Sequence, residues 1–332
     1  MIDHCPLFID HCPMHTMSWR GVRLKLQAHN VQVGTQQLEL RRCYRDNTGP
    51  PVLLLADFLH TSEIFLPRKG GEGGLAPFLA SLGYDVYLAE LRGRGNSWPG
   101  ISDTSDWGLH EAICEDIPAH LRTLEKLRPG QSQIWMGQGL GGLLLAASYA
   151  RLENRIALAG MVHFAVARRL RLETQRRVLA RHLWHFGPAA INLFCGYAAI
   201  PFSKPCRCET RKSLATWLQW QGSEGWLDPL DGFDYARALR ERGLPPSLYF
   251  ANGERALWGS VQDCRNWIAE LGAHDCRLVT ISSKGGNLHD YSHADLLQHP
   301  EACDDHFLQL QQWLAERTVR SEGPPPKAAI TC

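Results

Sequence analysis

The sequence has almost no net charge, no long apolar run and no regular cysteine framework. Lys and Arg number 35 against 34 Asp and Glu, so a net charge of +1 draws the chain toward neither nucleic acid nor an anionic membrane. No apolar run is long enough to span a bilayer. The N-terminus lacks the basic, apolar and small-residue series of a secretory signal. We therefore expect no nucleic-acid partner and no transmembrane segment.

The eleven cysteines are odd in number and scattered, which favours reduced thiols and a cytoplasmic protein over a disulfide scaffold. No convincing cofactor motif or metal-ligand spacing is present, so we expect neither a cofactor nor a metal. One segment departs from this: Ile2-Asp-His-Cys-Pro6 recurs as Ile9-Asp-His-Cys-Pro13. That density of His and Cys could bind a soft metal, but we favour a disordered arm over residues 1–16.

Short apolar runs alternate with helical periodicity over most of the chain, and 44% of the residues are hydrophobic. This alternation predicts one α/β core with a mostly parallel central sheet and helices on both faces. The predicted strands cover residues 22–26, 38–42, 51–55, 84–89, 134–136, 156–164, 247–251 and 277–281. The predicted helices cover residues 75–82, 107–127, 143–147, 233–242, 264–271 and 304–317.

The rhythm breaks between residues 166 and 231, where no clear strand is visible and arginines alternate with apolar and aromatic residues. We interpret 166–231 as an inserted helical cap over the ligand-binding edge of the sheet. The core then comprises 17–165 and 232–318, followed by a disordered tail over 319–332. Two interpretations of the arginines stay open: a solvated helix face or a site for an anionic ligand. The basic stretch consists of Arg168, Arg169, Arg171, Arg176, Arg177 and Arg181.

A glycine-rich turn in the middle of the chain is the most informative motif. Gly137-Gln138-Gly139-Leu140-Gly141 fits the nucleophile elbow G-x-S-x-G at every fixed position except the reactive one. Gly139 stands where the serine would be, which relieves backbone strain and removes the hydroxyl. The frame also satisfies G-x-G-x-x-G, but a dinucleotide fingerprint belongs in an early βαβ unit, so we disfavour that interpretation.

Three segments taken in order resemble the α/β-hydrolase superfamily, and most of all its bacterial lipase/esterase-like members. They are residues 78–97 with Arg-Gly-Arg-Gly-Asn-Ser, the elbow, and Tyr291-Ser-His-Ala-Asp-Leu-Leu297. The resemblance covers about residues 19–316 and implies the α/β-hydrolase fold. It also implies a degenerate catalytic triad, because three of the four functional positions depart from the family pattern.

The resemblance assigns roles position by position. His293 matches the general base, Gly139 the nucleophile position and Ala256 the acid position, where Asp is lost. In the oxyanion loop, Asp57 and Phe58 stand where the family has His-Gly, and a carboxylate there would oppose a developing oxyanion. The elbow neighbours Gln138 and Leu140 complete the candidate pocket residues.

Loss of the nucleophile in a serine triad costs on the order of a millionfold in rate, and loss of an oxyanion donor costs about a hundred- to a thousandfold. We therefore predict a pseudo-hydrolase that binds a small apolar or acyl-type ligand or a protein partner. The alternative is an enzyme that uses His293 as a general base without a covalent intermediate, as a hydrolase or lyase. Other polar groups could assist it: His60, Thr61, Ser62 and His289. A third hypothesis places the function in the basic cap.

Overall fold

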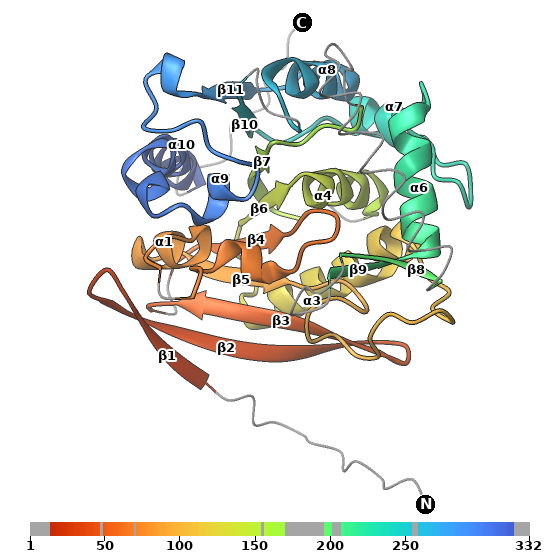
Figure 1. Cartoon of the computed structure of the whole chain (residues 1–332), viewed down its shortest axis with the longest axis horizontal. Helices are drawn as coiled ribbons and strands as arrows, with labels where there is room; N and C mark the ends of the chain where they lie inside the picture. Colours follow the sequence, from red (N-terminus) through yellow and green to blue (C-terminus); the bar gives the residue numbers. More distant parts are fainter. Residues whose placement is uncertain are drawn as a thin grey trace, which may run out of the picture.

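The structure is a computed structural model that describes residues 14–46, 49–69, 71–153, 156–169, 196–200, 207–253 and 258–321. Its centre is a twisted sheet with the strand order β1-β2-β3-β5-β4-β6-β7-β10-β11 (Figure 1). Strands β1 to β3 are antiparallel and β5 joins them antiparallel to β3, whereas every later pair is parallel. The strands are β1 (Met14–Trp19), β2 (Val22–Val33), β3 (Gln36–Tyr44), β4 (Pro51–Leu55), β5 (Asp85–Ala89), β6 (Gln133–Gln138), β7 (Leu158–Phe164), β10 (Ser247–Asn252) and β11 (Cys276–Ile281).

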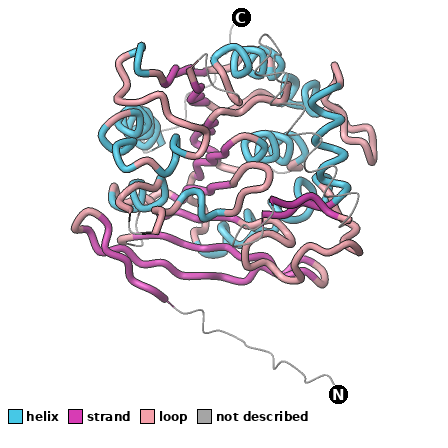
Figure 2. The backbone as a smooth tube through the Cα atoms, in the orientation of Figure 1, coloured by secondary structure: helices cyan, strands magenta, loops and turns pink. Residues whose placement is uncertain are grey.

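Helices cover both faces of this sheet (Figure 2). One apolar core lies between the sheet and α1, α9 and α10, and a second lies beneath α3, α4, α6, α7 and α8. The helices are α1 (Leu75–Ser81), α2 (Leu109–Glu111), α3 (Ile117–Leu127), α4 (Leu140–Arg151), α6 (Arg211–Gly222), α7 (Tyr235–Arg242), α8 (Val261–Leu271), α9 (Asp295–Gln298) and α10 (His306–Ser321). Shorter turns are η1 (Ser62–Phe65), η2 (Ala112–Asp116), η3 (Ser283–Gly285) and η4 (Pro300–Asp304).

The central strands are apolar along their whole length because both faces are covered. Every residue of β4, β5 and β6 is buried. The expected mostly parallel sheet with helices on both faces is therefore confirmed. The helix expected over 107–127 begins at Leu109 and contains a π turn at Ala112–Asp116, which periodicity alone does not reveal.

Two predicted ends differ from the structure. Residues 14–16, expected in the disordered arm, belong to β1, because their backbone finds hydrogen-bond partners on β2, with Met14 opposite Gln27. Residues 319–321, expected in the tail, belong to the last turn of α10. The rest of both segments, 1–13 and 322–332, lies outside the described residues.

The region expected to form a strandless cap does contain strands. β8 (Tyr197–Ile200) and β9 (Arg207–Thr210) pair antiparallel. Arg168 is buried, and its guanidinium forms an ion pair with Glu270 at 2.7 Å, so its charge is neutralised within the protein and is not offered to a ligand. Arg169 is exposed. The remaining arginines of the basic stretch lie outside the described residues, and the cap boundaries stay a prediction.

The structure also bears on the expectations about membrane spans and cysteines. No helix in the described part of the chain is long and apolar enough to cross a membrane. Most described cysteines are free, namely Cys43, Cys114, Cys264, Cys276 and Cys303. Cys208 of β9 is disulfide-bonded, so the expectation of reduced thiols throughout is wrong at that position.

Candidate functional site

The elbow keeps the backbone of a nucleophile turn. Between β6 and α4, Gly139 has φ +47° and ψ −121°, a conformation that side-chain-bearing residues adopt only under strain. Its glycine neighbours are required by close approach. A Cβ at Gly137 would lie 2.3 Å from the Gly142 nitrogen, and one at Gly141 would lie 2.2 Å from the Leu55 oxygen. The turn therefore requires glycine at Gly137 and Gly141, and it holds Gly139 in a conformation that a side chain would strain.

A carboxylate fills the space that a side chain at position 139 would occupy. A Cβ built on Gly139 would lie 2.2 Å from Cγ and Oδ1 of Asp57 and 2.3 Å from its Oδ2. Asp57 follows β4 by two residues and comes from the adjacent strand's loop. A side chain at position 139 and the Asp57 carboxylate in its present place exclude each other.

The same carboxylate accepts hydrogen bonds from three donors. Its Oδ1 accepts from the backbone N–H of Phe58 at 2.7 Å and of Leu140 at 2.5 Å, and its Oδ2 lies 2.7 Å from His293 Nε2. In hydrolases with a nucleophile elbow, the N–H after the nucleophile and an N–H of the preceding strand's loop form the oxyanion hole. In this chain the two N–H groups at the corresponding places, of Phe58 and Leu140, both donate to Asp57.

The surroundings keep Asp57 ionised. Burial acts to raise the pKa of its carboxyl, but the hydrogen bond and charge of His293, the charge of His60 and the Leu140 N–H outweigh burial and lower that pKa below its usual value. Burial lowers the pKa of the neighbouring His60, whose Nδ1 lies 2.9 Å from the Phe58 carbonyl oxygen. The site thus places the Asp57 carboxylate, which favours its ionised form, beside the His60 imidazole, which favours its neutral form.

The hydrogen bond to Asp57 decides which nitrogen of His293 carries the proton. An ionised carboxylate only accepts, so Nε2 must donate, and the tautomer follows from the network. Nδ1 is buried without a hydrogen-bond partner among the described residues. The family's acid would face this nitrogen, but Ala256, predicted at the acid position, lies outside the described residues.

A buried carboxylate beneath the oxyanion loop fixes that loop. Oε1 of Glu90 accepts from the backbone N–H of Ser62 at 2.7 Å and from its hydroxyl at 2.8 Å. Burial raises the pKa of Glu90 to about 7, although Ser62 and Arg41 oppose this rise. Ser62 is fully buried and Thr61 nearly so, so neither supplies a hydroxyl to the cavity, which corrects the alternative that gave them this role.

A cavity of about 1030 Å³ opens over the Asp57–His293 pair. The large apolar side chains in its wall include Phe58, Leu140, Trp217, Trp258 and Ile281. Polar groups at its surface include His60, Arg265 and Lys284. Gln138 does not line the described wall; it is buried and donates from Nε2 to the His293 carbonyl oxygen at 2.7 Å. Gln138 thus positions the histidine loop instead of touching a ligand.

Sequence reasoning missed part of this site. Glu90 gave no signal, because its importance rests on the contact with Ser62. Trp258 follows β10 by six residues and belongs to no periodic pattern. His289, expected as a second imidazole beside His293, instead pairs with Glu301.

The arrangement of sheet, elbow, histidine loop and cavity is the α/β-hydrolase fold. Solved structures share it. A soluble variant of monoglyceride lipase from Saccharomyces cerevisiae has a TM-score of 0.57 at 13% identity over 93% of this chain and 96% of that chain. A haloalkane dehalogenase variant from Bradyrhizobium elkanii has a TM-score of 0.58 at 17% identity over 89% and 98%. A carboxylesterase from the thaumarchaeon Nitrososphaera gargenis has a TM-score of 0.53 at 13% identity over 92% and 100%.

The sequence itself matches one family model. The model described as serine aminopeptidase, S33, aligns with residues 72–214, which include the elbow but end before His293. No curated protein matches the chain. The chain is therefore similar to esterases and lipases in fold. These similarities do not assign a reaction to it, so its chemistry has to be argued from the residues of the site.

Proposed function

We propose that this chain is a pseudo-hydrolase that binds an apolar or acyl-type ligand and does not cleave esters through an acyl-enzyme. The observation that carries the proposal is the position of the Asp57 carboxylate. It occupies the side-chain space of Gly139, both oxyanion donors and His293 Nε2 at once. A substrate carbonyl would have to displace an anion that three donors stabilise.

The alternative, an enzyme with His293 as general base, requires a free imidazole lone pair facing the ligand. Nε2 carries its proton toward Asp57, and Nδ1 is buried. A proton from a ligand in the cavity therefore has no acceptor on His293 until Asp57 moves away. This geometry favours the binding protein over the general-base enzyme.

The cavity supports the ligand class. Its volume of about 1030 Å³ exceeds the upper end of ordinary small-molecule sites, and its aromatic walls suit a hydrocarbon chain. Phe58 and Trp217 stack with ring centroids 6.3 Å apart along one wall. The folds of a monoglyceride lipase and a carboxylesterase are consistent with acyl-type cargo. A protein partner is the second kind of ligand for this scaffold, and the cytoplasmic location stays part of the proposal.

Displacement of a fluorescent fatty acid by fatty acids and monoacylglycerols of increasing chain length tests the binding. We expect saturable binding, weakened about tenfold by Trp258→Ala, since loss of one aromatic contact costs about 1.4 kcal/mol. Trp98→Ala is the matched control, because Trp98 is 66% exposed and lies outside the described cavity wall. Absence of binding across the panel would contradict the proposed ligand class.

A chromogenic ester screen tests the lack of hydrolysis. The native chain and His293→Ala should both be silent across short and long acyl chains. Turnover by the native chain that His293→Ala abolishes would contradict the pseudo-hydrolase and favour the general-base enzyme.

A further inference from the structure

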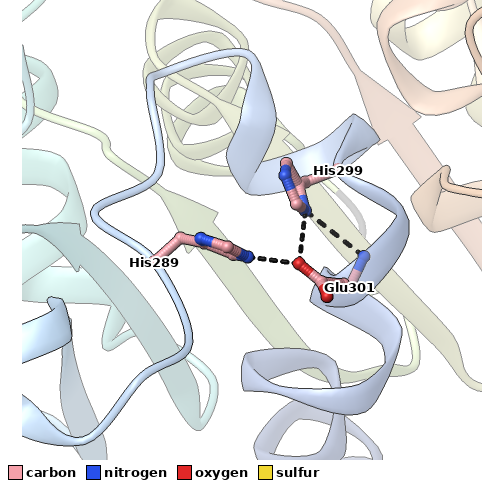
Figure 3. A group of neighbouring side chains, drawn as sticks. All are labelled: His289, His299 and Glu301. Atoms are coloured by element: carbon pink, nitrogen blue, oxygen red, sulfur yellow. Dashed lines mark hydrogen bonds and ion pairs between the residues drawn. The ribbon is translucent and has the colours of Figure 1, made fainter.

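A second cluster of polar side chains lies on the histidine loop, outside the described cavity wall. Figure 3 shows His289, from the loop before α9, and His299 and Glu301, from the start of η4, converging on one point. One ligand atom from each lies within 4.8 Å of the other two. His289 Nε2 contacts Glu301 Oε2, and His299 Nδ1 lies 4.0 Å from the same oxygen. The centroids of the His289 and His299 rings are 4.6 Å apart.

The donor atoms of the three side chains face one another. His299 Nδ1 accepts a long 3.3 Å hydrogen bond from the Glu301 N–H, so a cation would take over a lone pair that this hydrogen bond engages now. His289 Nε2 and the Glu301 carboxylate already face each other at the point where a cation would lie. Within the described chain, the only ion-pair partners recorded for Glu301 are these two histidines, so no lysine or arginine neutralises its carboxylate there.

We propose that His289, His299 and Glu301 form a binding site for a borderline divalent cation of the Zn²⁺ type. Two imidazole nitrogens and one carboxylate oxygen are a zinc-type donor set, with a fourth position open to water. Tetrahedral zinc with bonds of about 2.0–2.1 Å separates its ligand atoms by roughly 3.3 Å. The observed separations bracket that value, so closure needs side-chain movements of about an ångström. This proposal departs from the sequence-based expectation of no metal.

The cation would act on the loop that carries His293. His289 precedes His293 by four positions, whereas His299 and Glu301 follow it across α9. A shared cation therefore ties the segment before His293 to η4. The same segment is already held by Asp305, which accepts from Tyr291 Oη at 2.9 Å.

A comparable cluster shows what such a site must avoid. His110, Asp228 and Asp231 also converge, but Arg151 lies 2.9 Å from Asp228 and 2.8 Å from Asp231. Its guanidinium already supplies the positive charge that a metal would bring. His110 is therefore a matched control for a histidine beside carboxylates that should bind no cation.

Isothermal titration of the full chain, with its Cys208 disulfide intact, with Zn²⁺ tests the site. We expect one equivalent to bind, and Glu301→Gln and His289→Ala each to weaken its Kd at least tenfold, since loss of even an outer partner costs about 10–100-fold. His110→Ala should leave the Kd unchanged. The double variant Cys5→Ser/Cys12→Ser should also leave it unchanged, which separates this site from the His-Cys repeat at the N-terminus.

A thermal shift gives a second readout, because a ligand that binds only the native state raises Tm. Zn²⁺ should raise the Tm of the native chain and of His110→Ala, but not of Glu301→Gln. Absence of stoichiometric binding would overturn the proposal. Equal affinity in Glu301→Gln, or loss of binding in Cys5→Ser/Cys12→Ser, would overturn it as well.

Discussion

Two imidazole–carboxylate pairs have their histidines on the same loop, His289 and His293, four residues apart in sequence, but the surroundings of the two pairs differ. In the Asp57–His293 pair the side chains are 18% and 16% exposed, and backbone N–H groups complete the hydrogen bonding of the carboxylate. In the His289–Glu301 pair they are 44% and 53% exposed, and a third ligand, His299, stands beside them. The first pair is enclosed by backbone donors, whereas the second is exposed and has a third potential ligand beside it.

The largest effect should come from forcing a side chain into the first pair. Gly139→Ser combines a positive φ with overlap against the Asp57 carboxylate, and we expect it to lower the free energy of unfolding by roughly 3 kcal/mol. Urea unfolding measures it. Gly130→Ser is the matched control, since Gly130 has φ +67° with nothing within 4 Å, and should cost about 1 kcal/mol.

Removal of the Asp57 carboxylate separates the cost of steric overlap from the cost of the positive φ at position 139. Asp57→Gly/Gly139→Ser should recover most of the stability that Gly139→Ser loses. If the two Gly→Ser variants are equally stable, the carboxylate does not occupy the elbow.

The buried carboxyl of Glu90 should make the stability of the fold depend on pH. Its pKa of about 7 is raised above the unfolded value, so its contribution to stability is complete at low pH and is lost as pH rises through about 4.5 to 7. The loss is on the order of 3 kcal/mol. Denaturant unfolding across this range should show the Glu90→Gln variant gaining stability relative to the native chain as pH rises. Parallel pH profiles for the two chains would argue against a protonated Glu90 beneath the oxyanion loop.

Asp57 should respond to pH with the opposite sign. Its pKa is lowered in the fold, so its stabilisation is present above an unfolded pKa of about 3.9 and is lost as pH falls through the folded value. Asp57→Asn should cost about 1–3 kcal/mol at neutral pH, because His293 must move its proton to the unpartnered Nδ1. The variant's acid unfolding limb should also be shallower. A native-like acid limb in Asp57→Asn would contradict the ionised pair.

The smallest effect belongs to the exposed pair. Without a cation, Glu301→Gln should change the free energy of unfolding by less than about 0.5 kcal/mol, as for an exposed ion pair. The same urea titration checks it. A cost as large as that of Asp57→Asn would make the two pairs equivalent and remove the distinction drawn between them.

Much of the fold could be predicted from sequence because its signals are local. Apolar runs such as Pro51–Leu55 marked strands buried on both faces, and the spacing of Gly137, Gly139 and Gly141 marked the elbow. β1 was missed because its strand character depends on pairing with β2. The π turn within 109–127 was missed for lack of a periodic signature.

The site could be predicted only in part, since its central contact joins residues 236 positions apart. Sequence placed Asp57 in the oxyanion loop and His293 at the base position. It could not show that the carboxylate turns into the hole and takes its donors. Assignment of Gly139 and His293 to their family roles stays a prediction, as does Ala256 at the acid position.

The most direct test of the account is the protonation of His293 in the native chain, measured by long-range ¹H–¹⁵N NMR near neutral pH. The account predicts a proton on Nε2, hydrogen-bonded to the Asp57 carboxylate, and its transfer to Nδ1 in Asp57→Asn. A neutral ring with its proton on Nδ1 in the native chain, and an Nε2 resonance unchanged by Asp57→Asn, would contradict it. His293 would then offer a free lone pair to the cavity, and the chain would have to be treated as an enzyme.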